Sequence, residues 1–136
     1  MEDYFVSKVF EISYAHRLLN YNGKCENLHG HNGKIEIIVS SKKLDNEDMV
    51  MDFVKLKRIV GKWLDENLDH CIILHKKDPL VKILKKHNQK VFVLNFNPTA
   101  EVISKLIFDE VKKLGLNPRQ VKFWETETSM AAVMEE

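Results

Sequence analysis

Residues with rings or apolar side chains alternate with mostly polar residues along His29-Gly30-His31-Asn32-Gly33-Lys34-Ile35-Glu36-Ile37-Ile38-Val39-Ser40. Successive side chains of a β-strand point to opposite faces of a sheet, so residues of one parity share one face. Here one parity holds His29, His31, Ile35, Ile37 and Val39. The pattern predicts a strand over residues 29–40 whose largely apolar face begins with two imidazole rings.

A second alternating run lies upstream, over residues 3–16. Its even positions form one face with Phe10, Ile12, Tyr14 and His16. Residues 17–28, between the two runs, are polar and rich in the turn formers asparagine and glycine. The two strands could pair as a hairpin with a wide loop.

Two later stretches carry apolar residues at helical spacing. One follows Asp52, a candidate N-cap, and runs to about residue 67; the other follows Thr99 and ends at Gly115. Residues 68–75 have the character of a short irregular segment. The remaining expected elements are a short helix over residues 79–86 and strands over residues 91–95 and 120–126.

This order predicts an α+β fold, because the strands mostly alternate and such strands favour an antiparallel sheet with one covered face. We expect four antiparallel strands with two main helices packed on one face. A chain of 136 residues is most simply one domain, here residues 1–136.

Composition excludes several classes of function. The formal net charge of +1 predicts no nucleic-acid partner. No apolar run approaches the ~18 residues of a membrane span, so no membrane partner is expected. Two cysteines are too few for a disulfide framework, and the acidic N-terminus is unlike a signal peptide. A cytoplasmic protein with reduced thiols is the simplest expectation.

Three histidines form a candidate metal site. His29 and His31 are two residues apart, so their rings point the same way, and His16 ends the other strand on its apolar face. Three imidazoles with an open fourth position are typical of catalytic zinc. Zinc is the first choice, although imidazoles also bind iron, nickel and copper.

Cys25 precedes His29 by four residues and has two alternative roles. As a fourth ligand it would close the site and make it structural. As a free thiol beside a metal and an imidazole it would act as a base or nucleophile. The spacing alone leaves both alternatives open, whereas the apolar surroundings of Cys71 favour a buried, inert thiol.

Acidic residues add further candidates. Asp69 and His70 are adjacent and form a carboxylate–imidazole unit if they lie at a helix end or a turn. Glu125 shares the face of Val121 and Phe123, where a carboxylate needs a partner, such as the paired N–H donors of a cyclic guanidine. The alternative is a strand-end carboxylate in solvent.

The motifs together resemble the 6-pyruvoyl tetrahydropterin synthase superfamily over about residues 4–133. The matching segments are Ala15-His16, Cys25 with His29-Gly30-His31, Met51-Asp52-Phe53, Leu68-Asp69-His70, Asn97-Pro98-Thr99-Ala100-Glu101 and Trp124-Glu125-Thr126. The three-residue gap between Cys25 and His29 is similar to the 6-carboxy-5,6,7,8-tetrahydropterin synthase branch of the queuosine pathway.

The resemblance implies a role for each matching residue. His16, His29 and His31 would hold zinc, and Cys25 would be the general base rather than a ligand. Asp69 and His70 would complete a proton relay, supplied from a neighbouring subunit, and Glu125 would anchor the pterin ring and join the relay. The substrate contacts implied by the matching motifs are Thr99, Glu101 and Thr126, together with Glu125.

The resemblance also implies the tunnelling fold, assembled as a trimer or hexamer with sites at subunit interfaces. The implied reaction converts 7,8-dihydroneopterin triphosphate to 6-carboxytetrahydropterin, with release of triphosphate and acetaldehyde. One alternative is to stop at 6-pyruvoyltetrahydropterin after triphosphate elimination. An alternative of another class is a non-catalytic protein with a closed structural zinc site. Lys24 and Lys34 are candidates to meet the triphosphate.

Overall fold

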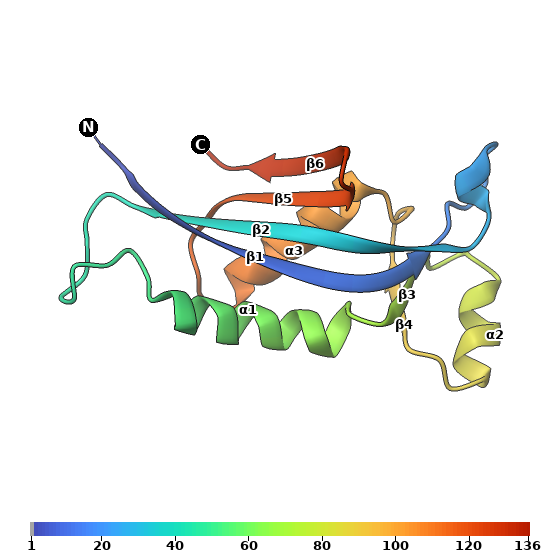
Figure 1. Cartoon of the computed structure of the whole chain (residues 1–136). Coiled ribbons are helices and arrows are strands. Elements are labelled where there is room, and N and C mark those ends of the chain that lie inside the picture. Colours follow the sequence, from blue (N-terminus) through green and yellow to red (C-terminus); the bar gives the residue numbers. More distant parts are fainter. Residues whose placement is uncertain (1) are drawn as a thin grey trace.

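The computed structural model describes residues 2–136 and contains one curled sheet with helices on one of its faces (Figure 1). Two long antiparallel strands, β1 (Tyr4–His16) and β2 (His29–Ser41), form its centre. They pair over their whole length, with His16 opposite His29 and Tyr14 opposite His31. The predicted wide-loop hairpin is therefore confirmed, and its loop contains the short 3₁₀ helix η1 (Lys24–Glu26).

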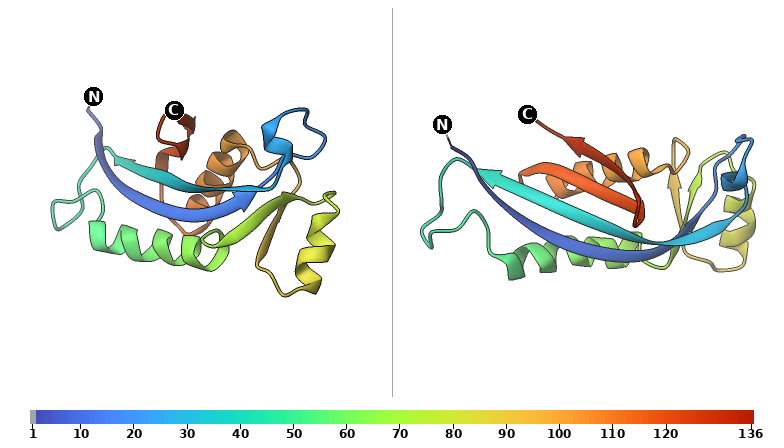
Figure 2. Two further views of the ribbon diagram at one scale, coloured as in Figure 1. Left: turned by 45° about the vertical axis from the view of Figure 1, so that its right-hand side comes forward. Right: turned by 45° about the horizontal axis from the view of Figure 1, so that its top comes forward.

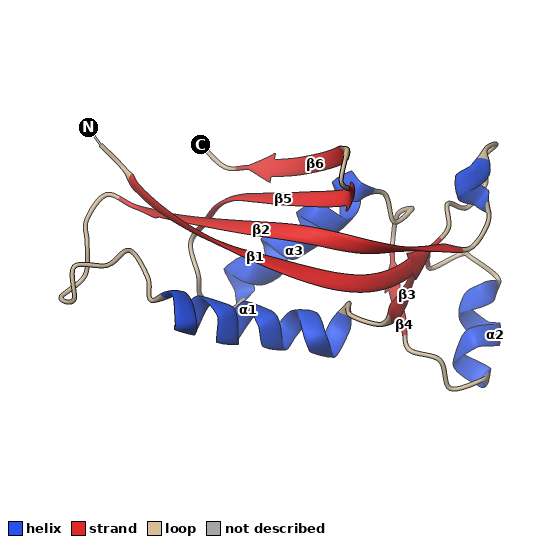
Figure 3. Cartoon of the chain, in the orientation of Figure 1, coloured by secondary structure: helices blue, strands red, loops and turns tan. Residues whose placement is uncertain are grey.

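The sheet has six strands in the order β4-β3-β1-β2-β5-β6, so the expectation of four strands was wrong in number (Figure 3). On the β2 side, β5 (Pro118–Thr126) and β6 (Ser129–Met134) continue the sheet in antiparallel pairing. On the β1 side, β3 (Cys71–His75) and β4 (Val91–Leu94) pair in parallel, so the sheet is mixed.

Two strands differ from the sequence-based expectation. The segment expected to be irregular contains β3, whose apolar run buries Cys71, Ile73 and Leu74. A continuous apolar run is typical of a buried parallel strand. Strand β3 is only five residues long and lacks the polar–apolar alternation by which a strand is recognised in sequence. Strand β6 was not expected at all, because its sequence Ser-Met-Ala-Ala-Val-Met contains neither turn formers nor a strong apolar alternation.

Two main helices pack on one face of the sheet, as predicted (Figure 2). Helix α1 (Phe53–Asn67) begins at Asp52, whose carboxylate accepts a hydrogen bond from the backbone N–H of Val54 at 2.7 Å. Helix α3 (Ala100–Lys113) begins at Thr99 and is followed by Gly115, which has φ +89°. The buried apolar residues of the two helices are Leu56, Val60, Leu64, Ile103, Ile107, Phe108 and Val111.

The third helix, α2 (Leu80–Lys86), lies at one end of the molecule, beyond the sheet (Figure 1). A partly buried ion pair attaches its start to the end of β1. The side chain of Asp78 is fully buried and accepts two hydrogen bonds from the guanidinium of Arg17. Asp78 also accepts a hydrogen bond from the backbone N–H of Leu80 at 2.9 Å. Arg17 directly follows His16, so this ion pair fixes α2 beside the histidines.

No helix among residues 2–136 is long and apolar enough to cross a membrane.

Candidate metal centre

The pairing of β1 with β2 brings the three candidate histidines together. His16 and His29 are direct cross-strand partners, and His31 lies two residues further along β2 on the same face. The ring centroids are 4.7 Å apart for His16 and His29, 5.1 Å for His16 and His31, and 4.9 Å for His29 and His31. One nitrogen from each ring lies within 4.8 Å of the other two, so the group could hold a metal ion.

Hydrogen bonds to backbone carbonyls orient two of the rings. The Nδ1 atom of His16 lies 2.7 Å from the carbonyl oxygen of Pro98, and the Nδ1 atom of His29 lies 2.6 Å from that of Asn27. A carbonyl oxygen only accepts, so both Nδ1 atoms carry the hydrogen and the neutral rings have a free lone pair on Nε2. The two Nε2 atoms are 3.2 Å apart, which makes them a converging pair of ligand atoms.

His31 supplies the third donor. Its Nε2 atom is buried and has no hydrogen-bond partner among residues 2–136, although a carboxylate oxygen of Glu125 lies 3.4 Å away. Burial lowers the pKa of His16 and of His31, so both rings favour the neutral, ligating form. An orphaned buried nitrogen aimed at two free lone pairs fits a metal ligand set.

A close fit of aromatic rings supports this group of histidines. Tyr14 lies on the same face of β1, with its ring 5.2 Å from that of His16 and 5.7 Å from that of Phe123. A Cβ atom added at Gly33 would lie 2.9 Å from Phe123 and 3.0 Å from Tyr14. Gly33 therefore leaves the space into which both rings pack beneath the site. The Tyr14 hydroxyl is buried without a partner in the described chain, and burial raises its pKa.

A cavity of about 500 Å³ opens beside the histidines. His16 and Cys25 line it together with Glu125 from the end of β5. Cys25 does not belong to the group of converging ligand atoms among residues 2–136, which contains the three histidines only. The arrangement therefore separates a three-nitrogen ligand set from a thiol and a carboxylate that face the same space.

The other expected substrate residues divide between the cavity and the surface. Thr99 and Glu101 both line the cavity from the start of α3. The hydroxyl of Thr99 also caps this helix by accepting from the backbone N–H of Val102 at 3.2 Å. Thr126 is exposed at the end of β5, and its hydroxyl lies 3.4 Å from that of Thr128. Thr126 does not line the cavity within residues 2–136.

Asp69 and His70 form the expected carboxylate–imidazole unit, but away from the cavity of their own chain. The Nδ1 atom of His70 lies 3.0 Å from Oδ2 of Asp69, and the other carboxylate oxygen accepts from the backbone N–H of Ser13 at 2.8 Å. Burial raises the pKa of Asp69, but these bonds and the charge of Lys90 outweigh it and the pKa is lowered. The His70 side chain is 80% exposed on a backbone with φ +57°.

The two lysines considered for a phosphate group lie in different places. Lys24 is exposed in η1, next to Cys25. Lys34 lies on the face of β2 opposite to the histidines, where its ammonium group is 4.1 Å from the centre of the Trp124 ring.

One wall of the cavity is not predicted by the sequence. The hairpin strand β6 contributes Ser129, Met130, Ala131 and Ala132, and Leu18 adds a further contact. No local signal marks these residues, because β6 becomes a cavity wall only through its pairing with β5.

Comparisons with known proteins identify the family. The sequence profile of 6-pyruvoyl tetrahydropterin synthase matches residues 5–136. The chain belongs to the 6-pyruvoyl tetrahydropterin synthase family. Among curated proteins, it is 36% identical to a Haemophilus influenzae protein named 6-carboxy-5,6,7,8-tetrahydropterin synthase, covering 96% of this chain and 98% of that protein. Proteins of the same name from Aquifex aeolicus and Rickettsia bellii are 35% and 40% identical, over 96% and 74% of this chain.

Solved structures of other proteins have the same architecture. An uncharacterized protein from Wolinella succinogenes is 26% identical, covers all of both chains and has a TM-score of 0.81. The 6-pyruvoyl tetrahydropterin synthase of Caenorhabditis elegans is 22% identical, with a TM-score of 0.73 over all of this chain and 98% of the other. The tunnelling fold expected from the family resemblance is therefore confirmed.

Proposed function

We propose that this protein is a zinc-dependent 6-carboxy-5,6,7,8-tetrahydropterin synthase of the queuosine pathway. In the proposed reaction, 7,8-dihydroneopterin triphosphate and one water give 6-carboxytetrahydropterin, acetaldehyde and triphosphate. The names of the curated relatives support a pterin synthase activity. The observation that carries the proposal is the shared cavity, which His16 of the histidine group lines together with Cys25 and Glu125.

His16, His29 and His31 would hold the metal through their Nε2 atoms, since Nδ1 of His16 and His29 is bonded to backbone carbonyls. A zinc ion in this position supplies Lewis-acid chemistry, which stabilises negative charge on oxygens of the substrate side chain. Three ligands leave room for such oxygens, unlike a closed four-ligand structural site. The absence of Cys25 from the converging group of described residues favours the open alternative.

Cys25 would act as the general base. It is half-buried in η1, where the backbone N–H of Leu18 donates to its carbonyl oxygen at 2.8 Å and holds the loop against the end of β1. In the proposed role its thiolate removes a proton from a carbon of the substrate side chain, which promotes loss of the triphosphate. A positioned base of this kind contributes about 10²–10⁴ to the rate.

Asp69 and His70 would pass protons to the cavity of a neighbouring subunit. Their hydrogen-bonded pair keeps His70 in a fixed orientation, and its exposed imidazole is not among the residues that line the cavity of its own chain. A relay residue outside its own cavity requires a second chain, so the proposal includes a homo-oligomer, a trimer or hexamer, with sites at subunit interfaces. A cytoplasmic location is part of the same proposal.

Glu125 would anchor the pterin. Its carboxylate is 24% exposed at the cavity wall, where it accepts the two parallel N–H donors of the pterin's guanidine-like edge. Thr99 and Glu101 would contribute contacts from the start of α3, and Thr126 would do so from the end of β5. The cavity volume of about 500 Å³ suits a ligand of the size of a pterin with a three-carbon side chain.

The decisive experiment incubates zinc-loaded protein with 7,8-dihydroneopterin triphosphate and identifies the products by mass spectrometry. We expect equal amounts of acetaldehyde and a carboxypterin, together with inorganic triphosphate. A pyruvoylpterin with triphosphate but without acetaldehyde would instead assign the elimination-only reaction. No conversion by protein that is folded and zinc-loaded would reject the catalytic proposal in favour of a structural zinc protein.

A further inference from the structure

Positive charge is concentrated in one short segment of the chain. Residues 75–90 contain six lysines and one aspartate, a formal charge of +5, while the whole chain carries +1. The other residues therefore have a net charge of −4. This segment comprises α2 and the loops on either side of it, at one end of the molecule.

Most of these lysines have no carboxylate partner. We define the basic surface as Lys24, Lys76, Lys77, Lys82, Lys85 and Lys86, all of which are exposed. None of them forms an ion pair with any residue in the described range 2–136, whereas the ammonium groups of Lys105, Lys112 and Lys113 on or ending α3 all lie near carboxylates. The one acidic residue of the segment, Asp78, is buried and neutralised by Arg17. The exposed Glu26 lies two residues from Lys24 in η1, so the uncompensated positive charge of the basic surface lies mainly on the lysines of residues 76–86.

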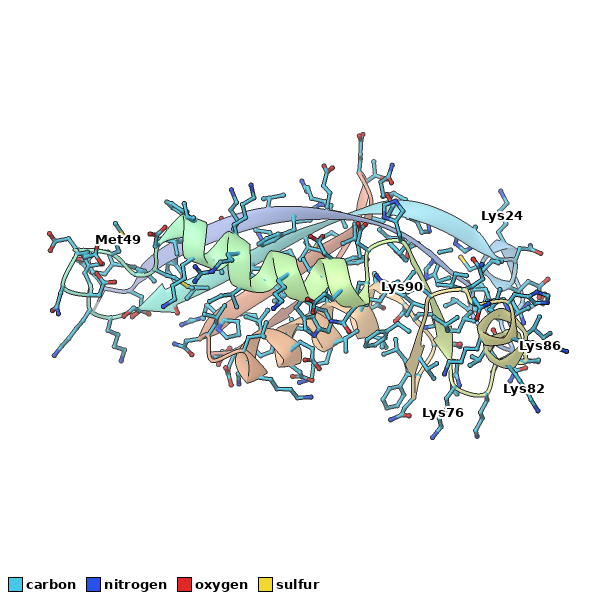
Figure 4. All side chains as sticks on the ribbon, turned by 90° about the horizontal axis from the view of Figure 1, so that it is seen from below. Lys24, Met49, Lys76, Lys82, Lys86 and Lys90 are labelled. Carbon is cyan, nitrogen blue, oxygen red and sulfur yellow. The ribbon has the colours of Figure 1, made fainter. Side chains whose placement is uncertain are left out.

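The lysines of the basic surface gather at one end of the molecule, where Figure 4 shows Lys24 on the same side as Lys76, Lys82 and Lys86. Lys24 is the sequence neighbour of Cys25, which lines the cavity, and Lys76, Lys82 and Lys86 gather at that end around α2. The ion pair of Arg17 with Asp78 holds α2 beside the strand end that carries His16. None of the six lysines lines the cavity within residues 2–136, so the basic surface would meet a charged group outside the cavity.

We propose that the basic surface attracts the polyphosphate tail of the substrate and holds it while the pterin ring enters the cavity. This inference rests on the proposed function, since it concerns the triphosphate of that substrate. A triphosphate carries several negative charges, and unpaired lysines attract it across about 8–10 Å of solution at physiological salt. Fields of this kind raise association rates by about 10–10³ and weaken steeply as salt is added.

The test compares two triple variants of equal charge. The first, Lys76→Gln/Lys82→Gln/Lys86→Gln, removes three charges from the basic surface. The control, Lys42→Gln/Lys43→Gln/Lys57→Gln, removes three exposed lysines that also form no ion pair in the described chain. Residues 42 and 43 lie near Met49, at the opposite end of the molecule (Figures 1 and 4).

We expect kcat/KM for dihydroneopterin triphosphate at about 50 mM salt to fall roughly tenfold in the first variant, with little change in kcat. The control should stay within about twofold of the wild type. At about 500 mM salt the difference between the two variants should disappear, because the charges are then screened. Equal values of kcat/KM for the two variants at low salt would overturn the proposal.

Binding of inorganic tripolyphosphate, measured by calorimetry without turnover, separates this inference from the proposed function. We expect the first variant to bind this probe about tenfold more weakly than the control. Weaker binding in a protein that turns over no substrate would reject the pterin reaction while retaining the anion site. Unchanged tripolyphosphate binding, with loss of binding to RNA or to anionic vesicles in the first variant, would assign the surface to a macromolecule and overturn the proposal.

Discussion

The two sides of the β1–β2 hairpin differ in how they build the site. On the β2 side, long antiparallel strands and the β5–β6 hairpin supply cavity-lining groups, among them Glu125 and Met130. On the β1 side, the short parallel strands and α2 supply none of the cavity-lining residues, but this side holds the Asp69–His70 unit and five of the six lysines of the basic surface. We call the β2 side the antiparallel side and the β1 side the parallel side. In the proposed enzyme, the antiparallel side supplies residues of the chain's own active site. The parallel side supplies the relay to a neighbouring subunit and attracts the substrate.

The largest expected effect tests the chemical role of the cavity. Replacement Cys25→Ala should lower turnover by about 10³, equivalent to about 4 kcal/mol of activation free energy, because it removes the proposed base. Zinc content should remain at the wild-type level, since the three histidines alone form the converging ligand group within residues 2–136. Steady-state kinetics and elemental analysis of the same sample measure both.

Cys71 provides the matched control. It is a buried thiol in β3, and burial raises its pKa to about 12, so it is inert as a base at neutral pH. Replacement Cys71→Ala should lower stability but keep turnover per folded molecule. Joint loss of zinc and of the folded state in Cys25→Ala would show that Cys25 is a structural ligand.

The second prediction tests how much the partly buried ion pair of Arg17 with Asp78 contributes to the stability of the parallel side. Replacement Asp78→Ala leaves the Arg17 guanidinium without its carboxylate and should lower the free energy of unfolding by about 3 kcal/mol. Chemical denaturation measures this difference. The control Asp109→Ala breaks the exposed pair with Lys105 and should cost only about 0.5 kcal/mol. Equal effects of the two replacements would mean that the pair contributes no more than a surface contact.

The same contrast explains what could be predicted from sequence. The hairpin and its histidines were predictable because a period of two over thirteen residues sets the face of each side chain, and the two strands are neighbours in the chain. Asp52 and Thr99 could be predicted as helix caps because a capping side chain bonds to a backbone N–H only two or three residues further along the chain.

The parts that escaped prediction depend on distant contacts. Strand β3 pairs with β1 across more than fifty residues, and its five residues bury an apolar run with no alternation. Strand β6 lines the cavity only because β5 aligns it there. The location of Asp69 and His70 outside their own cavity also follows from tertiary structure, since the backbone N–H of Ser13 in β1 donates to Asp69 across 56 residues of sequence.

The third prediction returns to the antiparallel side. In Gly33→Ala the new methyl group would lie about 3 Å from the Phe123 and Tyr14 rings, so the core beneath the histidines would be overpacked. We expect a loss of about 2 kcal/mol of unfolding free energy. The control is Gly61→Ala, within helix α1. Its new Cβ would lie 3.7 Å from Phe10, an ordinary contact, and alanine favours a helix more than glycine does, so the free energy of unfolding should instead rise by about 0.5–1 kcal/mol. A neutral Gly33→Ala would show that the two rings adjust without cost.

The smallest expected effect concerns the pH dependence of the parallel side. The pKa of Asp69 is lowered in the folded chain because Ser13, His70 and Lys90 outweigh its burial. The ionised carboxylate therefore stabilises the folded state at pH values above its ordinary pKa of 3.8. This contribution is lost as the pH falls through the lower pKa that the group has in the folded state. Replacement Asp69→Asn should cost at most about 1 kcal/mol at neutral pH, because the carboxylate is 28% exposed and screened.

Denaturation of both proteins between about pH 7 and pH 3 measures this contribution, and the two stabilities should converge towards the acid end. His70→Ala is the companion variant, because it removes the imidazole and keeps the carboxylate and its bond to Ser13. It should show a smaller stability loss than Asp69→Asn. A stability difference for Asp69→Asn that stays constant across this pH range would mean that the carboxylate acts through packing rather than charge.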